Sequence, residues 1–335
     1  MSWLILNISG GGIFITDLAG GIGLHTVDAG AGDVKLHVVD GSITAIADGG
    51  SADIIGTELH ISVTDPSSHI GVLEAPIEID GVVLRSVTTE GGSIFMADLA
   101  GGIAVDLVST TDAAGSAIYL VAFDGSIVEN PDADADLITE SLFIGATGSG
   151  TLGTGDEALE IEVDNLSAIT EGGSIWMTDL SGGVVIDSVT TGGADGSVIE
   201  LTAIEGSILE TEPGDAGPDL HAETVKLTVT GANQSIGTTT NGIEIIADSI
   251  VLDGGDRIFL NPQNPPGTPA PAVTFGPNPP GLAILNAQVA GGADIHLYKQ
   301  AITVLDPYRD IQLFIGSNLS FPEAGELILS YEGLE

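Results

Sequence analysis

A long tandem repeat is the feature that most limits how this chain can fold. The segment GGGIFITDLAGG near the start returns as GGSIFMADLAGG and again as GGSIWMTDLSGG. Two evenly spaced series of aspartates mark equivalent positions, Asp17, Asp98 and Asp179 in one and Asp53, Asp136 and Asp219 in the other. Three units of about 82 residues thus fill roughly the first 250 positions. Such arrays are typical of solenoids, in which each unit packs only against its neighbours.

Hydrophobic residues inside each unit alternate with polar ones, as in β-strands that bury one face. In LEIEVD, the side chains of Leu159, Ile161 and Val163 share one side of the strand, and acidic side chains share the other. Turns rich in glycine, aspartate and serine separate these strands, with no helical stretch between them. We therefore predict an all-β fold, a parallel β-helix (β-solenoid) with coils of about 20 residues, four to a unit, and an irregular C-terminal section.

The composition shows that the chain can fold, and it limits the classes of partner that the chain can bind. The net charge is -42, with 48 acidic residues against six basic ones, yet 43% of the residues are hydrophobic, which is too many for a disordered chain. Such a surface is not expected to bind nucleic acid or an anionic membrane, because it has no basic cluster to pair with phosphate. No stretch is suited to membrane insertion. The lack of cysteine excludes disulfides, thiol chemistry and cysteine-based zinc sites.

Three regions are predicted. Residues 1–260 form the β-helix, residues 261–282 form a proline-rich excursion, and residues 283–335 return to strand-like alternation. Proline cannot donate to a β-ladder, so the excursion is expected to loop out of the solenoid. The last region either caps the open end of the solenoid or continues it. The opening MSWLILNISGG lacks the basic and apolar regions of a signal peptide, which favours an internal fragment of a longer protein.

The repeat also resembles a known family. The succession ALEIEVDNLSA, SIWMTDLSGGVVIDSVT and VIELTAIEGSI is similar to the repeat region of filamentous-haemagglutinin-like giant bacterial adhesins, over about residues 4 to 250. The resemblance implies a right-handed parallel β-helix, a secreted or cell-surface location, and a role in adhesion or matrix building. It implies no catalytic residues.

Acidic clusters are candidate calcium sites. Asp132, Asp134 and Asp136 form a DADAD run, and Asp253 and Asp256 frame a DGGD turn. Calcium prefers several carboxylate and carbonyl oxygens at a flexible turn. The alternative is that aspartate simply favours turns. No other cofactor is expected.

Three aromatic residues are candidate ligand contacts. Phe14, Phe95 and Trp176 occupy equivalent positions in the three units and are expected in one column, four coils apart. Such a column could contact glycan rings, or its members could pack beneath corners and loops.

These observations favour a structural or adhesive shaft segment of a large bacterial surface protein, without enzymatic activity. The expected partners are glycans or proteins of a host or neighbouring cell, and end-to-end self-association is a further expectation. A polysaccharide-active β-helix enzyme and a self-assembling extracellular fibre or matrix subunit are the alternatives. The carboxylates show no constellation that separates a catalytic pair from the acidic background.

Overall fold

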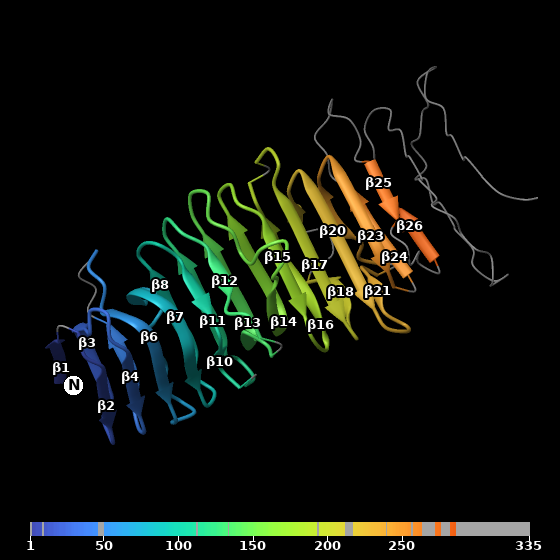
Figure 1. Cartoon of the computed structure of the whole chain (residues 1–335). Coiled ribbons are helices and arrows are strands. Elements are labelled where there is room, and N and C mark those ends of the chain that lie inside the picture. Colours follow the sequence, from blue (N-terminus) through green and yellow to red (C-terminus); the bar gives the residue numbers. More distant parts are fainter. Residues whose placement is uncertain are drawn as a thin grey trace, which may run out of the picture. The chain divides into compact units, whose positions relative to one another are not determined.

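The computed structural model describes residues 2–8, 10–45, 50–111, 113–132, 134–192, 194–211, 217–238, 240–255, 257–262, 272–275 and 282–285. The chain divides into two compact units, residues 1–177 and 178–335. Each unit is built of stacked parallel β-strands, and the described residues contain no helix (Figure 1). The predicted all-β parallel β-helix is therefore confirmed.

The first unit contains β1 to β14 and the start of β15. The strands are β1 (Ser2–Asn7), β2 (Ile13–Asp17), β3 (Ile22–Asp28), β4 (Val34–Val38), β5 (Ile43–Ala45), β6 (Ile54–Val63), β7 (Ile77–Thr89), β8 (Ile94–Asp98), β9 (Ile103–Val105), β10 (Val108–Ser109), β11 (Ala117–Ala122), β12 (Ile127–Glu129), β13 (Leu137–Ala146), β14 (Leu159–Thr170) and β15 (Ile175–Asp179).

The second unit contains the remaining strands. They are β16 (Gly183–Thr190), β17 (Val198–Ile204), β18 (Ser207–Glu210), β19 (Leu220–His221), β20 (Thr224–Thr230), β21 (Ser235–Ile236), β22 (Ile243–Ile246), β23 (Ser249–Gly254), β24 (Arg257–Pro262), β25 (Ala272–Phe275) and β26 (Leu282–Leu285).

Parallel pairing in register sets the length of a coil. Stacked strands follow one another at intervals of about 24 residues. In the first unit β8, β11, β13 and β14 keep this interval, with Ile94, Ile118, Leu142 and Leu166 opposite one another. The interval varies near the start, where Ile43 lies closer in sequence to its partner Ile22 than to its partner Ile70.

The coils are about 24 residues long and so are longer than predicted. One sequence repeat therefore spans between three and four coils, and the expectation of four was wrong.

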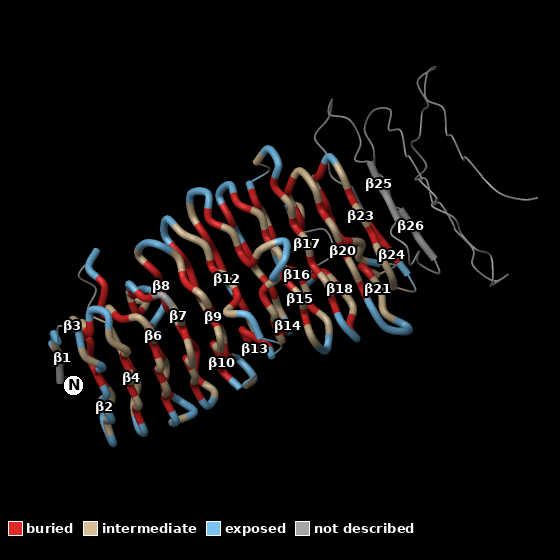
Figure 2. The backbone as a smooth tube through the Cα atoms, viewed as in Figure 1, coloured by how far each residue is buried: buried red, intermediate tan, exposed pale blue. Residues whose placement is uncertain are grey.

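Each coil buries one face of its strands. On β14, Leu159, Ile161 and Val163 are buried, and the side chains between them face outward. Figure 2 shows the same alternation along the other strands, with exposed residues concentrated at the turns. The inward positions predicted from the alternation in LEIEVD are confirmed. Burial of these aliphatic side chains, each contributing about 1.5–3 kcal/mol, is the main source of stability.

The first aspartate series closes a turn. In each repeat Oδ2 of the aspartate accepts a hydrogen bond from the N–H of a glycine four residues later, at 2.9–3.0 Å: Asp17 with Gly21, Asp98 with Gly102, and Asp179 with Gly183. These glycines have φ values of 76 to 80°, a conformation that glycine adopts without the steric penalty of a side chain. The recurring DLAGG and DLSGG motifs are thus turn signals.

The second aspartate series joins neighbouring coils. Oδ2 of each aspartate accepts a hydrogen bond from the N–H of a glutamate in the next coil, at 2.7–2.9 Å: Asp53 with Glu78, Asp136 with Glu160, and Asp219 with Glu244. All three aspartates are almost fully buried. The carboxylate supplies an acceptor at a strand start, where the preceding loop leaves the ladder, so the backbone N–H stays paired. The aspartate recurs because each repeat has this strand start.

Two short strands follow β24 in the second unit. Strand β25 pairs in parallel with β23, and β26 pairs in parallel with β24. β25 falls within the proline-rich segment that was predicted to leave the solenoid, and its four residues AVTF contain no proline and can complete a ladder. The rest of that segment from residue 263, and the predicted C-terminal region beyond Leu285, lie outside the described residues.

Candidate contact face

One face of the first unit carries a column of aromatic side chains. Phe95 on β8, Tyr119 on β11 and Phe143 on β13 lie opposite one another in register. The rings of Tyr119 and Phe143 stack, with centroids 4.6 Å apart and planes inclined by 2°. Such a stack fits the spacing of adjacent β-strands, about 4.8 Å. Each of these two rings therefore covers one face of the other.

The column ends at a small residue. Ser167 on β14 lies opposite Phe143 in the next coil, and a serine covers less of a ring than an aromatic residue does. Phe143 accordingly remains 37% exposed. The accessible surface of the column therefore consists of ring edges together with part of Phe143.

A second apolar column runs beside the first. Ala97, Val121, Gly145 and Ile169 follow one another on the same four strands. Ile169 leans over Gly145, because a Cβ built on that glycine would lie 3.1 Å from Cγ2 of Ile169 and 3.7 Å from Cγ2 of Val121. Ile169 is 43% exposed, and Phe123, two residues after Val121, is 45% exposed. Together the two columns form the aromatic face: Phe95, Ala97, Tyr119, Val121, Phe143, Gly145, Ser167 and Ile169. Of these, Ala97, Val121 and Gly145 are buried.

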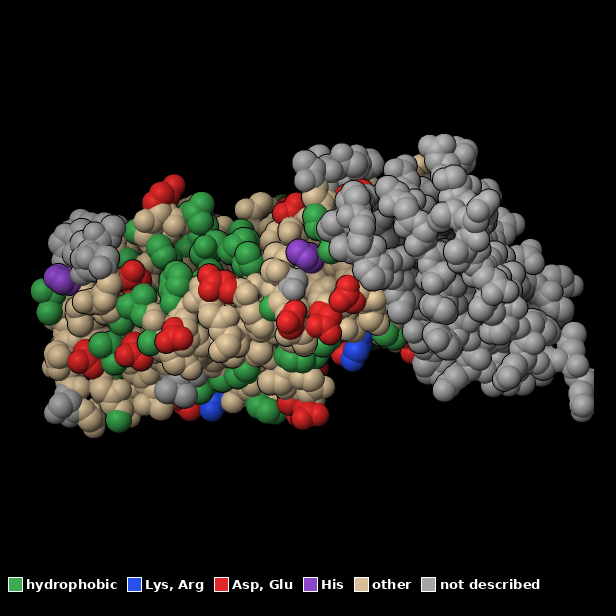
Figure 3. Space-filling model, turned by 90° about the horizontal axis from the view of Figure 1, so that it is seen from above, with side chains coloured by type: hydrophobic (Ala, Val, Ile, Leu, Met, Phe, Trp, Pro, Cys, Tyr) green, Lys and Arg blue, Asp and Glu red, His purple; other side chains and the backbone are tan. Residues whose placement is uncertain are grey.

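The aromatic face is uncharged in a chain that is otherwise strongly acidic. Figure 3 shows hydrophobic side chains gathered between acidic ones on one side of the molecule. The exposed apolar area comes from Phe143 and Ile169, together with the half-buried Phe95 and Tyr119. Exposed apolar area commonly marks a contact surface, because its contact with water is unfavourable. The aromatic face is therefore the candidate functional site.

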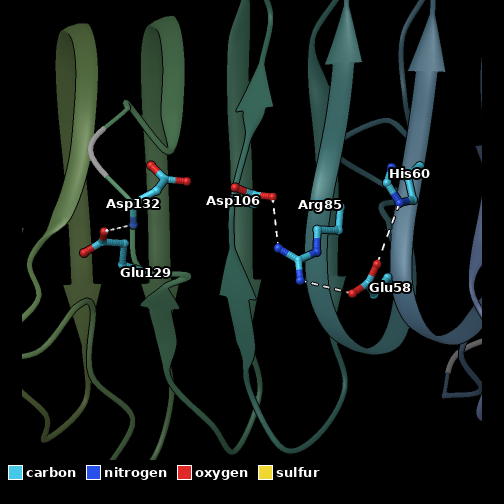
Figure 4. Close-up of polar contacts among 6 residues, drawn as sticks. All are labelled: Glu58, His60, Arg85, Asp106, Glu129 and Asp132. Carbon is cyan, nitrogen blue, oxygen red and sulfur yellow. Dashed lines mark hydrogen bonds and ion pairs between the residues drawn. The ribbon is translucent and has the colours of Figure 1, made fainter.

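Other outward positions of the first unit carry charges that are paired across coils. Arg85 on β7 lies between Glu58 and Asp106, with N···O distances of 3.1 and 3.3 Å (Figure 4). His60 lies 4.0 Å from Glu58, and desolvation, followed by the nearby charge of Lys35, lowers the pKa of His60. Arg85 thus offsets part of the repulsion between acidic residues stacked along the solenoid.

The three predicted aromatic candidates do not form one column. Phe14 pairs with Lys35, whose Nζ lies 5.7 Å from the ring centroid, and it is 67% exposed. Phe95 belongs to the aromatic face. Trp176 is half-buried against a turn, since a Cβ on Gly155 would lie 3.6 Å from its Nε1. The single column was a wrong expectation, because a repeat does not contain a whole number of coils.

Most of the calcium candidates can be placed in the structure. Asp132 and Asp134 are exposed in the loop after β12, where Oδ1 of Asp132 accepts the N–H of Asp134 at 2.8 Å. Asp136 is buried and bonded to the next coil, Asp253 lies on β23, and Asp256 falls outside the described residues. In the part of the chain that the structure describes, no group of three or more acidic or histidine side chains is arranged to hold a metal ion.

Two buried aspartates have altered acidity. Desolvation, partly opposed by the Gly102 N–H, raises the pKa of Asp98 to about 6. Desolvation, together with Glu129, Glu160 and Asp132, raises the pKa of Asp136 to about 8. Both groups hold turns or coils together, and neither belongs to the aromatic face.

The aromatic face was missed in the sequence because aromatic residues were compared at the repeat spacing. Its signal is the equal spacing of Phe95, Tyr119 and Phe143, which matches the length of one coil. The strand register is not visible in the sequence, so comparing residues at the repeat spacing of about 82 residues hid the shorter interval of one coil.

Among the described residues, the structure has no helix of the length and apolarity that crossing a bilayer requires. The chain matches no family model, no curated protein and no solved structure.

Proposed function

We propose that this chain is a structural and adhesive shaft segment of a large secreted or cell-surface bacterial protein, and that it contacts its partner through the aromatic face. The observation that carries the proposal is one uncharged, aromatic sheet face on a solenoid whose other outward positions carry many charges. A parallel solenoid supports itself without disulfides, because each coil pairs fully with its neighbours. Its acidic surface keeps it soluble and discourages non-specific association.

The chemistry of the aromatic face limits the kinds of partner that it can bind. A neutral partner fits best, since the face offers ring edges, part of Phe143 and the side chain of Ile169, without charge. Apolar faces of sugar rings and apolar protein surfaces both meet this requirement. Anionic polymers are disfavoured by the surrounding carboxylates.

Binding of the purified full chain to host-cell monolayers tests this function, before and after enzymatic removal of their surface glycans. The double variant Tyr119→Thr, Phe143→Thr should lose most binding, since it removes the stack and keeps residues suited to strands. A matched control is Glu200→Thr, Lys226→Thr, which removes an outward cross-strand pair joined at 3.1 Å in the second unit. Equal binding by both variants would rule out the aromatic face as the contact.

The same face favours a second candidate, a subunit that associates sideways with other copies into a matrix. Two flat apolar sheets can pack face to face about 10 Å apart. Sedimentation velocity at low and high salt separates the two candidates. Association that strengthens with salt and is lost in the Tyr119→Thr, Phe143→Thr variant would support matrix assembly.

A further inference from the structure

Asp136 and Glu160 lie on the same side of adjacent coils. The N–H of Asp136 donates to the carbonyl of Glu160 at 2.8 Å, and the N–H of Glu160 donates back to Oδ2 of Asp136 at 2.9 Å. The neighbouring Leu137 and Ile161 pair in register and point inward, so the two acidic side chains both point away from the core. Paired residues on adjacent strands lie about 5 Å apart, and the charge of Glu160 is one of those that raise the pKa of Asp136.

Each of these side chains has one oxygen without a donor. Oδ1 of Asp136 and Oε2 of Glu160 are both buried, and among the described residues no group donates a hydrogen bond to either atom. Asp136 as a whole is fully buried, although it points away from the core. A buried carboxylate oxygen without a donor is costly, because it has lost its bonds to water and gained none.

The charged groups that act on this pair are all acidic. Glu129 on β12, Asp132 and Asp134 in the following loop, and Glu157 before β14 all oppose ionisation of the pair. Burial adds to this effect and raises the pKa of both groups. Ionising both carboxyl groups together is therefore unfavourable.

We propose that Asp136 and Glu160 share one proton, in a carboxyl–carboxylate hydrogen bond that fastens the loop between β12 and β13 to the next coil and opens as pH rises. Oδ1 of Asp136 carries the proton and donates it to Oε2 of Glu160, so the two unmatched acceptors become one donor and one acceptor. When the bond opens, the proton passes to solvent. The two carboxylates then repel each other, and Glu129 repels both of them. This latch is independent of the proposed function.

The direction of the pH effect follows from proton binding. The folded chain holds a proton on the pair that the unfolded chain, with ordinary carboxyl groups, releases near pH 4. The stabilisation is therefore fully present below about pH 4 and is lost as pH rises toward about 8, the folded pKa of Asp136. Around neutral pH the latch is still mostly closed.

Two variants test the latch in the full chain. In Asp136→Asn the amide donates to Glu160 at every pH, and in Glu160→Gln the amide donates to Asp136, so either variant mimics the protonated pair. Each should melt a few degrees above wild type at about pH 9, and within a degree of it at about pH 4, where the stabilisation from the proton is still complete. Asp164→Asn is the matched control, since it removes an exposed carboxylate of β14 that is not among the charges acting on the pair, and it should keep the wild-type slope of melting temperature against pH.

Carbon-13 NMR of labelled aspartate and glutamate carboxyls reads the proton directly. The signals of one coupled pair should titrate at a pH well above that of the other carboxyl groups. In Asp136→Asn no signals should titrate at that high pH. An Asp136→Asn variant that keeps the wild-type pH slope, or carboxyl signals that all titrate in the ordinary range, would overturn the proposal. Calcium provides a second test. If millimolar calcium raised the melting temperature of wild type at about pH 9 but not that of Asp136→Asn, the proposal would also be overturned, because a cation would then bridge the two carboxylates.

Discussion

Gly125 lies directly against Gly102 of the preceding coil, so that a Cβ on Gly125 would come within 2.2 Å of the Gly102 nitrogen. The contact joins the DLAGG turn of one coil to the DGSI segment of the next. It recurs between Gly41 and Gly21, and between Gly206 and Gly183. The two short motifs recur together in each repeat because their glycine backbones stack.

This stacking predicts the cost of a single methyl group. Gly125→Ala should destabilise the chain by about 2–3 kcal/mol, because its Cβ meets backbone atoms that cannot move away. Gly125 has no positive φ, so the cost is steric and not conformational. Gly155→Ala is the matched control, since its Cβ meets nothing closer than 3.6 Å and its φ is also not positive. Urea unfolding of both variants measures the difference, and equal midpoints would contradict the account of the turn.

The strands and their buried faces could be predicted from the sequence because alternation of period two is a local property. Leu159, Ile161 and Val163 show it within a single strand. Coil length could not be predicted in this way, since it depends on how many residues separate one strand from the next strand that pairs with it in register. The aromatic face depends on that length, so Phe95, Tyr119 and Phe143 could not be grouped. The two aspartate series were visible as landmarks, but their roles need the positions of Gly102 and the Glu160 N–H.

The core should respond to truncation far more than the outer face. Leu201 on β17 is 2% exposed, and Leu201→Ala should cost about 2–5 kcal/mol through lost burial and the cavity that remains. The adjacent Thr202 faces outward, and Thr202→Ala should cost less than about 1 kcal/mol. Thermal melts compare the two, and similar losses would mean that the faces of β17 are assigned the wrong way round.

Outward acidic positions are not interchangeable. Alternation along the strands places residues 160 and 200 alike on the outward side, but their surroundings differ. Glu200 pairs with Lys226 at 3.1 Å, so Glu200→Lys places two cations opposite each other and should lower the melting temperature slightly. Glu160→Lys places a cation beside Glu129 and Asp136 and should raise the melting temperature at about pH 8. A loss of stability in Glu160→Lys at that pH would show that the acidic surroundings of Glu160 do not repel one another.

Asp98 should add its own pH dependence. Its pKa in the folded chain is about 6, above the ordinary 3.8, so the folded chain binds more protons in this range. The stabilisation from the proton is complete below about pH 4 and is lost as pH rises through about 6. Asp98→Asn keeps an oxygen for the Gly102 N–H but does not titrate, so its melting temperature should fall less than that of wild type between about pH 4 and about pH 7. An unchanged fall would exclude Asp98 as its source.

Salt and calcium should act on the net charge of -42 in the same way. Carboxylates repeated from coil to coil repel one another, and salt screens this repulsion over a distance of about 8 Å at physiological strength, so added sodium chloride should raise the melting temperature. Calcium ions screen the same repulsion, so the effect of millimolar calcium on the melting temperature is compared with that of sodium chloride of equal ionic strength. Further stabilisation by calcium would reveal a specific site. Asp132→Asn and Asp256→Asn would then assign that site, according to which variant loses the extra stabilisation.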